Sequence, residues 1–340
     1  MKKRFQVTLD DIASNLNVSK VTVSKALRGH PDISYETTKK IRSLARELGY
    51  LPNYMARNLS SKHTRMIGVV VPKIAHFFFS SVIEAIYDVA FKHNYEIILT
   101  VSQENEEREL KHLQTLLSMR VDGILISVSQ QTKDYAIFQR VKDMGIPITF
   151  MDRIANVEGF NSVIADDFMG AFAATEQMIK VGYKKIGHLA GYSHTSIGNE
   201  RYRGFEAAMK HYGIPIREEW VVRNGFSEDD GYASFMKLYE SKNLPEVLFA
   251  VTYPVALGVY SAVDQLGMKI PKDVDIISFG KSRLNQFLSP PMSYIEQPTT
   301  ELGEKALDLT LECIRQKDEF TPRTIKIPTK LVLCGTCIGT

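Results

Sequence analysis

Short apolar runs alternate with amphipathic segments through residues 67–280, and this alternation constrains the fold more than any other feature. Three of the runs are IGVVV at 67–71, GILISV at 123–128 and VLFAVT at 247–252. Between such runs the apolar residues recur at helical spacing, for example at 106–120. Continuous apolar strands separated by helices are typical of parallel sheets that are buried on both faces. The pattern therefore predicts an α/β architecture.

The part of the chain that carries this alternation is too long for one ordinary core. It spans roughly 275 residues, and chains commonly divide into domains above about 250 residues. We therefore predict two doubly wound parallel-sheet subdomains. Open parallel sheets bind ligands at the carboxyl ends of their strands, so two sheets that face each other should leave a binding cleft between them.

Charge is distributed unevenly along the chain. Residues 1–62 hold twelve Lys or Arg against five Asp or Glu, a net charge of +7, whereas the whole chain carries +3. Residues 63–340 therefore sum to −4. Attraction to phosphates supplies most non-specific DNA affinity, and a basic segment of this size is its expected footprint.

Residues 8–29 have the pattern of two short helices joined by a tight turn. Thr8 and Asp11 have the spacing of a capping box ahead of apolar residues at helical spacing. Ser19 is placed to cap a second helix at 20–27, which ends before Gly29. The residues that this second helix turns outward are small, polar or basic: Lys20, Val21, Thr22, Ser24 and Lys25. The pattern favours a helix-turn-helix that reads the major groove, and the alternative is a helical hairpin with a solvated basic face.

A third helix, predicted at 35–48, completes a small helical domain. Ser34 can cap it and Gly49 can end it. Its apolar residues, with those of the first two helices, supply one core for about sixty residues, which is workable for an independent domain.

The sequence lacks the signals of secreted, membrane-spanning and disulfide-rich proteins. The basic start Met1–Arg4 is not followed by the apolar core of a secretion signal, and no run reaches the eighteen apolar residues of a membrane helix. Three cysteines are too few for a disulfide framework, so we expect a cytoplasmic protein. Cys334 and Cys337 have the spacing of metal ligands, but the sequence offers no second pair, so we expect no metal or other cofactor.

The sequence contains no motif that indicates an enzymatic reaction. Gly280, Lys281 and Ser282 resemble the end of a phosphate-binding loop, but Asp275 stands where that loop requires a glycine. Hydrolase and metalloprotease motifs are absent from the sequence. We therefore predict that the protein is not an enzyme.

Motifs in a fixed order over nearly the whole chain resemble the LacI/GalR family of transcriptional regulators. The helix-turn-helix is followed by YLPNYMARNLSSKHT at 50–64, GVVVPKIAHFFFSSVIEAI at 68–86, GYKKIGHLAG at 182–191 and VDIISFG at 274–280. The resemblance implies a three-helix DNA-binding head, a hinge helix and a periplasmic-binding-protein-like core that dimerises and binds a small molecule in its cleft. Double-stranded operator DNA, a small-molecule effector and a second copy of the chain are thus the expected partners, with no membrane contact.

The resemblance also sets expected domain bounds. The DNA-binding domain covers 1–50, the hinge helix and linker 51–63, and the effector-binding and dimerisation core 64–340. Within the core we expect an N-subdomain at about 64–162 plus 294–325. The C-subdomain should comprise about 163–293 plus 326–340. Because the chain ends soon after a strand with no heptad repeat, we expect a homodimer in preference to a tetramer.

DNA-side roles carry over from the family by position. Lys20, Val21 and Lys25 match its base-reading positions; a lysine can donate to guanine, and valine offers an apolar contact to a thymine methyl. The other positions of the head at which we predict DNA contact are Thr8, Ser19, Thr22, Ser24 and His30. All of them except His30 match positions that are better suited to capping or to phosphate contact than to base reading.

The segment 53–59 resembles the hinge helix. Asn53 begins it, Ala56 is small enough for the minor groove, and Leu59 matches the leucine that wedges between base pairs, with an ordinary core leucine as the alternative. A helix of about seven residues is too short to persist alone in water, so it should form only with DNA and the partner hinge.

Effector-side positions also carry over. Arg201 matches the arginine that holds the effector, and the aromatic wall positions are Phe78, Phe79 and Phe226, each with core packing as the alternative. The remaining predicted contacts are Asp152, Tyr253, Gly280 and Gln297.

Two of these positions depart from the family. Thr252–Tyr253 stand where sugar-responsive relatives carry Asn-Asp, and Gly280 stands where they carry a carboxylate that binds sugar hydroxyls. Basic residues remain at Lys73, Arg153, Arg201 and Lys281. We therefore hypothesise an anionic effector such as a sugar phosphate or sugar acid, against the alternative that Lys73 and Lys281 are solvated rim residues.

The sequence as a whole predicts a DNA-binding transcriptional repressor of carbohydrate metabolism, controlled by a carbohydrate-type effector in the cleft. The rival is a periplasmic-type ligand-binding protein with the same core and no DNA output. That rival would need a signal peptide and no basic helical head, and both features of the sequence go against it.

Overall fold

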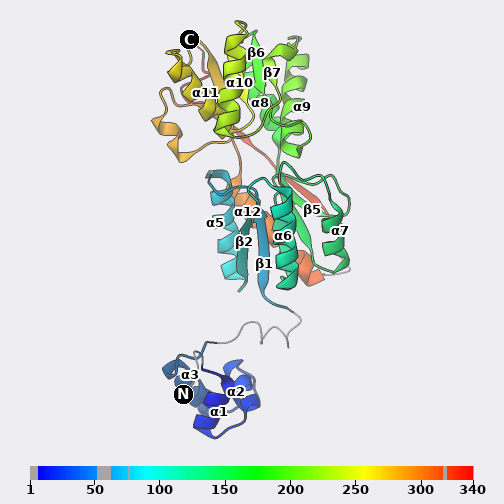
Figure 1. Ribbon diagram of the computed structural model, residues 1–340, viewed down its shortest axis with the longest axis vertical. Helices are drawn as coiled ribbons and strands as arrows, with labels where there is room; N and C mark the ends of the chain where they lie inside the picture. Colours follow the sequence, from blue (N-terminus) through cyan, green and yellow to red (C-terminus); the bar gives the residue numbers. More distant parts are fainter. Residues whose placement is uncertain (1–6, 52–62, 76, 317–319, 340) are drawn as a thin grey trace. The chain divides into compact units, whose positions relative to one another are not determined.

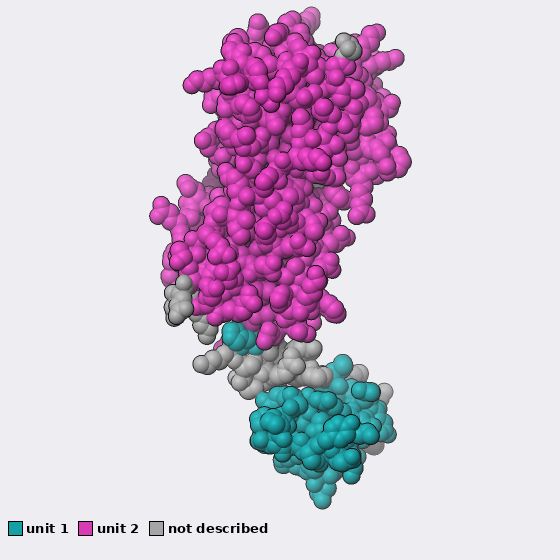
Figure 2. All heavy atoms as spheres, turned by 180° about the vertical axis from the view of Figure 1, so that it is seen from behind, with its two compact units in different colours: residues 1–64 teal, residues 65–340 magenta. Residues whose placement is uncertain are grey.

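A computed structural model describes residues 7–51, 63–75, 77–316 and 320–339 of the chain. The chain forms two compact units, residues 1–64 and 65–340, and each is described by itself (Figure 2). Among the described residues no helix is both long enough and apolar enough to cross a bilayer.

The described residues of the first unit form a bundle of three short helices, α1 (Leu9–Leu16), α2 (Lys20–Leu27) and α3 (Tyr35–Glu47) (Figure 1). All three begin at a hydroxyl cap, since the side chains of Thr8, Ser19 and Ser34 each accept a hydrogen bond from a backbone N–H in the first turn. The core of the unit consists of Ile12, Ala13, Val23, Ala26, Ile41 and Ala45. Capping and apolar spacing thus explain these helices from local sequence.

The second unit contains two six-stranded sheets. The first sheet is parallel throughout, in the order β11-β5-β4-β3-β1-β2. Its strands are β1 (Met66–Val71), β2 (Glu96–Val101), β3 (Gly123–Ile126), β4 (Ile148–Met151), β5 (Asn161–Ala165) and β11 (Thr324–Ile327). The strands β1, β3, β4 and β5 are mostly buried, as their continuous apolar runs require, whereas the edge strand β2 is mostly half-buried.

Helices cover both faces of this sheet, as Figure 1 shows. Apolar residues of α5 (Phe77–Lys92) and α12 (Thr299–Gln316) form one core with the sheet. Those of α6 (Glu106–Ser118) and α7 (Ala136–Asp143) form the other. The predicted doubly wound arrangement is therefore confirmed here.

The second sheet has the order β12-β10-β9-β8-β6-β7. Its strands are β6 (Ile186–Leu189), β7 (Val221–Val222), β8 (Val247–Ala250), β9 (Asp275–Phe279), β10 (Ser293–Glu296) and β12 (Lys330–Val332). The pairing of β10 with β12 is antiparallel, whereas the other strand pairs of this sheet are parallel, as predicted for a doubly wound subdomain. The antiparallel direction of β12 follows from the path of the chain, because β10 leads out of the second sheet toward the first, whereas β12 begins where the chain returns from β11 to the second sheet.

Helices also cover both faces of the second sheet. One core contains residues of α10 (Glu228–Glu240) and α11 (Tyr253–Gln265), and the other those of α8 (Asp167–Val181) and α9 (Ser196–His211). Two short 3-10 helices, η1 (Glu218–Trp220) and η2 (Arg283–Phe287), complete the unit.

The chain passes between the two sheets three times. β5 and β11 belong to the first sheet, whereas β10 belongs to the second. The crossings therefore follow Ala165, Glu296 and Ile327, two or three residues beyond the expected positions 162, 293 and 325. Each expected crossing fell inside a strand that is completed before the chain leaves the sheet.

Candidate functional site

Helix α2 presents the side chains that were predicted to read DNA. Val23 and Ala26 are buried against the other two helices, whereas the side chain of Val21 is 63% exposed. Ser19 and Lys20 are exposed as well, and Thr22, Ser24 and Lys25 are partly exposed. The helix therefore turns toward solvent the face that the sequence predicted.

The hydroxyl groups on this face already take part in capping. The Ser19 hydroxyl accepts from the Thr22 N–H at 3.0 Å and lies 2.8 Å from the Thr22 hydroxyl. The Thr8 hydroxyl donates to the Asp11 carboxylate at 2.7 Å, and that carboxylate accepts from the Thr8 N–H at 2.8 Å, which completes the predicted capping box. Capping thus fixes where the first turns of α1 and α2 present their N–H groups.

The basic side chains of the face are in ion pairs. The ammonium group of Lys20 lies 2.7 Å from the carboxylate of Asp10, and that of Lys25 lies 2.9 Å from Asp32. The His30 imidazole is 3.3 Å from the same Asp32 carboxylate. Neither Asp10 nor Asp32 was predicted from the sequence as a partner of these cations.

The predicted hinge residues Asn53, Ala56 and Leu59 lie outside the described residues. Their assignment stays a prediction.

In the second unit, one cavity of about 200 Å³ lies between the two sheets. All eight residues predicted to contact an effector line it: Phe78, Phe79, Asp152, Arg201, Phe226, Tyr253, Gly280 and Gln297. They come from the starts of α5 and α11, from α9 and from loops that follow strands of both sheets. Lys73, which the sequence analysis counted among the basic groups, is not among the lining residues.

Aromatic rings form much of the cavity wall. Phe78 and Phe79 are in edge-to-face contact with their ring centroids 5.0 Å apart, and Phe226 meets Tyr192 edge-to-face at 5.9 Å. Phe79 and Phe226 also belong to the cores behind the wall, so core packing and cavity lining are not alternatives for them.

Arg201 is 2% exposed and fully engaged by its neighbours. Its Nε donates to the Asp167 carboxylate at 2.8 Å and its Nη1 donates to the Val251 carbonyl at 2.6 Å. The guanidinium carbon lies 3.7 Å from the centroid of the Phe279 ring. Burial raises the pKa of Asp167 to about 6, against the opposing effect of the Arg201 charge.

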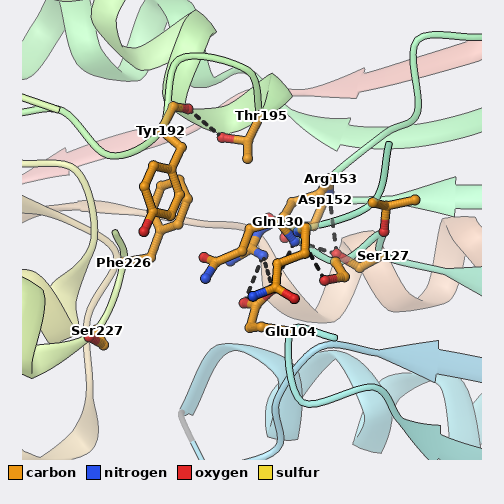
Figure 3. Close-up of polar contacts among 12 residues, drawn as sticks. Glu104, Ser127, Gln130, Asp152, Arg153, Tyr192, Thr195, Phe226 and Ser227 are labelled. Carbon is orange, nitrogen blue, oxygen red and sulfur yellow. Dashed lines mark hydrogen bonds and ion pairs between the residues drawn. The ribbon is translucent and has the colours of Figure 1, made fainter. Parts of the chain in front are cut away.

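Arg153 is also buried and paired. Its Nη1 lies 2.8 and 2.9 Å from the two oxygens of Glu104, and its guanidinium carbon lies 4.9 Å from the Phe226 centroid on the other subdomain (Figure 3). Its Nε has no hydrogen-bond partner among the described residues. Beside it, Asp152 accepts from the Ser127 hydroxyl at 3.3 Å, and burial raises the pKa of the Asp152 carboxyl.

The third cation at the cavity is Lys281, which is paired with Glu296. Next to it, Gly280 has a φ of +83°, and a Cβ built there would lie 2.8 Å from Oε1 of Gln297. The Tyr253 hydroxyl is buried without a hydrogen-bond partner among the described residues, and burial raises the pKa of Tyr253 to about 12.

Sequence reasoning missed the three countercharges Glu104, Asp167 and Glu296. A signal existed for each, because each lies at or just beyond the carboxyl end of a strand, where ligand-side groups of parallel sheets gather. Pairing itself leaves no sequence signal, since Arg153 and Glu104 are 49 residues apart.

Two further hydrogen bonds join the subdomains beside the cavity. The His194 Nε2 lies 2.8 Å from the Gln130 carbonyl oxygen, and the Ile154 N–H donates to the Ser196 hydroxyl at 3.1 Å. The loop that carries Gln130 is held in turn by Glu104, which accepts from the Gln130 N–H at 2.9 Å. A change at Glu104 therefore acts on both subdomains.

Comparison with known families matches both units. Residues 64–334 match the model described as "Periplasmic binding proteins and sugar binding domain of LacI family", and residues 8–53 match "Bacterial regulatory proteins, lacI family". The chain belongs to the LacI family. The prediction of a DNA-binding transcriptional regulator of this family is confirmed, and the rival without a DNA output is not favoured.

Individual relatives agree with this assignment. The HTH-type transcriptional repressor PurR of Actinobacillus pleuropneumoniae serotype 3 is 30% identical over 96% of this chain and 97% of its own. A crystal structure of the lac repressor dimer bound to operator and the anti-inducer ONPF has a TM-score of 0.85 at 23% identity, over 98% of this chain and 99% of that one, and supports the fold. A LacI family regulator from Enterococcus faecium with bound ribose has a TM-score of 0.71 at 26% identity, over 80% and 98%.

Within the LacI family this chain is a repressor-type regulator and not an enzyme, as predicted. Its family implies operator DNA and a small-molecule effector as partners.

Proposed function

We propose that this LacI-family protein represses transcription by binding a pseudo-palindromic operator through α2, and that a small molecule in the cleft controls this binding. The observation that carries the proposal is the exposed face of α2, where Lys20, Val21 and Lys25 project from a helix fixed at its start by the Ser19 cap. Lysine donates to guanine O6 and N7, and valine packs on a thymine methyl. The hydroxyl residues beside them suit phosphate contacts, which set register.

In vitro selection of duplexes from a random pool by the full chain tests the DNA output. Two related half-sites should emerge from the wild type. Lys25→Ala should lose its preference at one base position of each half-site, worth about 1–3 kcal/mol for a good base contact. The matched control Lys40→Ala removes the same charge from the exposed side of α3 and should keep the preference. A selection without any enriched sequence would refute the proposal.

We further propose that the effector is an uncharged, carbohydrate-type molecule. Each cation at the cavity already has a carboxylate partner: Arg201 has Asp167, Arg153 has Glu104 and Lys281 has Glu296. Asp152 and Glu228 add acidic groups to the lining. An anionic ligand would have to compete with these internal carboxylates, so the paired charges favour a neutral ligand over the anion inferred from the sequence.

The remaining groups suit a polyol with an apolar ring face. Phe78 and Phe226 offer flat apolar surfaces, while Arg153 Nε and the Tyr253 hydroxyl are buried polar atoms without a hydrogen-bond partner in the described part of the chain. Unpaired buried polar groups are costly, and ligand hydroxyls would satisfy them. The ribose in the Enterococcus faecium relative is a neutral sugar of this chemical class.

Calorimetry with pentoses and hexoses, each beside its phosphate ester, tests the effector class. A neutral sugar should bind, and Phe226→Ala should weaken its binding about two- to tenfold, because an aromatic face contributes about 0.5–1.5 kcal/mol beyond its buried area. Tyr239→Ala, an aromatic truncation at a 39% exposed position of α10 outside the cavity, serves as the control. Binding of phosphate esters alone would contradict the proposal and restore the anionic effector.

We also propose that the regulator is a homodimer. Tyr87 and Phe91 lie four residues apart on α5 and are 45% and 85% exposed, and Phe287 of η2 is 75% exposed. Exposed aromatics at helical spacing are typical of interfaces. Phe91→Asp combined with Phe287→Asp should give a monomer in sedimentation velocity, whereas the wild type should sediment as a dimer; a wild-type monomer would contradict this proposal.

A further inference from the structure

Two carboxylates of the head hold the two lysines of α2. Asp10, in the first turn of α1, lies 2.7 Å from the Lys20 ammonium, and Asp32, between α2 and α3, lies 2.9 Å from that of Lys25. The side chains of Lys20 and Asp10 are 58% and 62% exposed, and those of Lys25 and Asp32 are 34% and 56% exposed. Both pairs therefore lie where a duplex would approach α2.

The pairing covers every basic side chain of the predicted DNA-reading set within the described residues. That set contains Lys20, Lys25 and His30, and the His30 imidazole shares the Asp32 carboxylate at 3.3 Å. Helix capping does not account for Asp10, because its neighbour Asp11 closes the capping box with Thr8. These acids are thus placed against the DNA-reading cations and not against the helix ends alone.

A carboxylate beside an ammonium group changes what that group can bind. A free lysine is attracted to any phosphate, and this attraction is independent of sequence. A paired lysine must first exchange its carboxylate for the phosphate, and the carboxylate itself repels the DNA backbone. Exposed ion pairs are individually weak, so they yield where a matching site supplies base acceptors as well as phosphates.

We propose that Asp10 and Asp32 are specificity-determining positioning residues, which hold Lys20 and Lys25 in internal ion pairs and so weaken the binding of α2 to duplexes of the wrong sequence. Each pair also restricts a flexible four-carbon side chain to the exposed edge of α2. This inference rests on the proposed DNA-reading role of α2, since it concerns how that helix discriminates.

Fluorescence anisotropy of the full chain tests this inference, with the selected operator and a scrambled duplex of equal length and composition. For Asp10→Asn combined with Asp32→Asn, affinity for the scrambled duplex should rise about three- to tenfold at low salt. The slope of log affinity against log salt should steepen by about one to two, because each freed lysine neutralises one more phosphate. The ratio of operator to scrambled affinity should fall by several-fold.

Matched variants separate this effect from a simple change of charge. Glu47→Gln removes one negative charge at the last residue of α3, and it should leave both the slope and the affinity ratio as in the wild type. Asp32→Glu keeps the carboxylate and should keep the wild-type ratio, whereas Asp32→Asn alone should lower it.

The inference is overturned if Asp10→Asn and Asp32→Asn behave like Glu47→Gln in slope and ratio. That outcome would leave the DNA-reading role intact, since the wild type would still prefer its operator. A wild type without sequence preference would instead refute the proposed function itself, so the two failures are distinguishable.

Discussion

At the scale of single residues, buried charges of opposite sign organise the effector cavity. Arg153 and Arg201 are both less than a tenth exposed, and each is held by a carboxylate from another element. A buried charge is tolerated when it is paired and hydrogen-bonded, and removing one partner is costly. These pairs therefore fix the cavity's polar geometry and limit the net charge that a ligand can bring.

His188 lies in the core behind the cavity and makes the stability of the second unit depend on pH. It is fully buried, its ring stacks on Phe249 with centroids 4.6 Å apart, and burial lowers its pKa to about 3. Because the unfolded chain takes up a proton below about pH 6.5 and the folded state does not, this group makes stability fall as pH decreases from there.

Replacing His188 with Phe should remove this contribution. Between pH 7 and pH 5 the wild type should lose about 2 kcal/mol of unfolding free energy more than His188→Phe does, at about 1.4 kcal/mol per pH unit for one proton. Urea unfolding followed by tryptophan fluorescence at the two pH values measures this difference. An equal loss in both proteins would mean that His188 is protonated in the folded state.

Alanine substitutions at Gly280 and Gly267 distinguish the effect of backbone strain from an effect on the cavity. Gly280 and Gly267 both have positive φ, +83° and +67°, but a Cβ at Gly267 would meet no atom of the described residues within 4 Å, whereas one at Gly280 would meet the amide oxygen of Gln297. Because the positive φ strains an alanine at either position, and the Gln297 amide is the end of a flexible side chain, Gly280→Ala and Gly267→Ala should each lower the free energy of unfolding by about 1–2 kcal/mol.

Only Gly280→Ala should weaken effector binding, because the Gln297 side chain must move to make room for the new methyl group. Calorimetry of both variants with the sugar bound by the wild type measures this. Equal affinities in the two variants would show that Gln297 does not contact the effector.

At the scale of secondary-structure elements, local sequence specifies the head helices closely. The Thr8, Ser19 and Ser34 caps and the buried Val23 and Ala26 were all predictable, because capping and apolar spacing act within one or two turns. The strands β10 to β12 were harder to place. Their sheet membership depends on partners far along the chain, as in the pairing of Tyr294 with Val332.

The Ser19 cap allows a direct test of how α2 is held. Ser19→Ala should reduce the protection of α2 amides in hydrogen exchange of the full chain by about 1 kcal/mol, because it leaves the Thr22 N–H without its acceptor. Ser19→Gly should cost only a few tenths of a kcal/mol by the same measurement. Equal protection in Ser19→Ala and wild type would rule out the cap as a support of the reading helix.

At the scale of the whole molecule, the cleft lies between two sheets that the chain joins at three crossings, after Ala165, Glu296 and Ile327. The cavity residues come from both subdomains, so an effector that contacts Phe78 and Phe226 together stabilises one relative arrangement of the sheets. A ligand shifts such an equilibrium by its difference in affinity for the two arrangements.

The sequence predicted which residues line the cavity better than it predicted how their charged groups are paired. All eight nominated residues line one cavity, because family positions at the ends of strands are set by topology. The pairing of Arg153, Arg201 and Lys281 was not predictable, since it depends on side-chain contacts between distant segments. That pairing is why we propose a neutral effector in place of the anion that the sequence suggested.

The central claim is that binding of an effector in the cleft changes the affinity of the head for its operator. The most direct test is to measure how each of the two ligands changes the affinity for the other. Operator affinity should be measured by anisotropy with and without the saturating sugar, and sugar affinity by calorimetry with and without operator. We expect both affinities to change by the same factor, and Phe226→Ala to abolish the change. An operator affinity that stays constant while the sugar occupies the cleft would contradict the account.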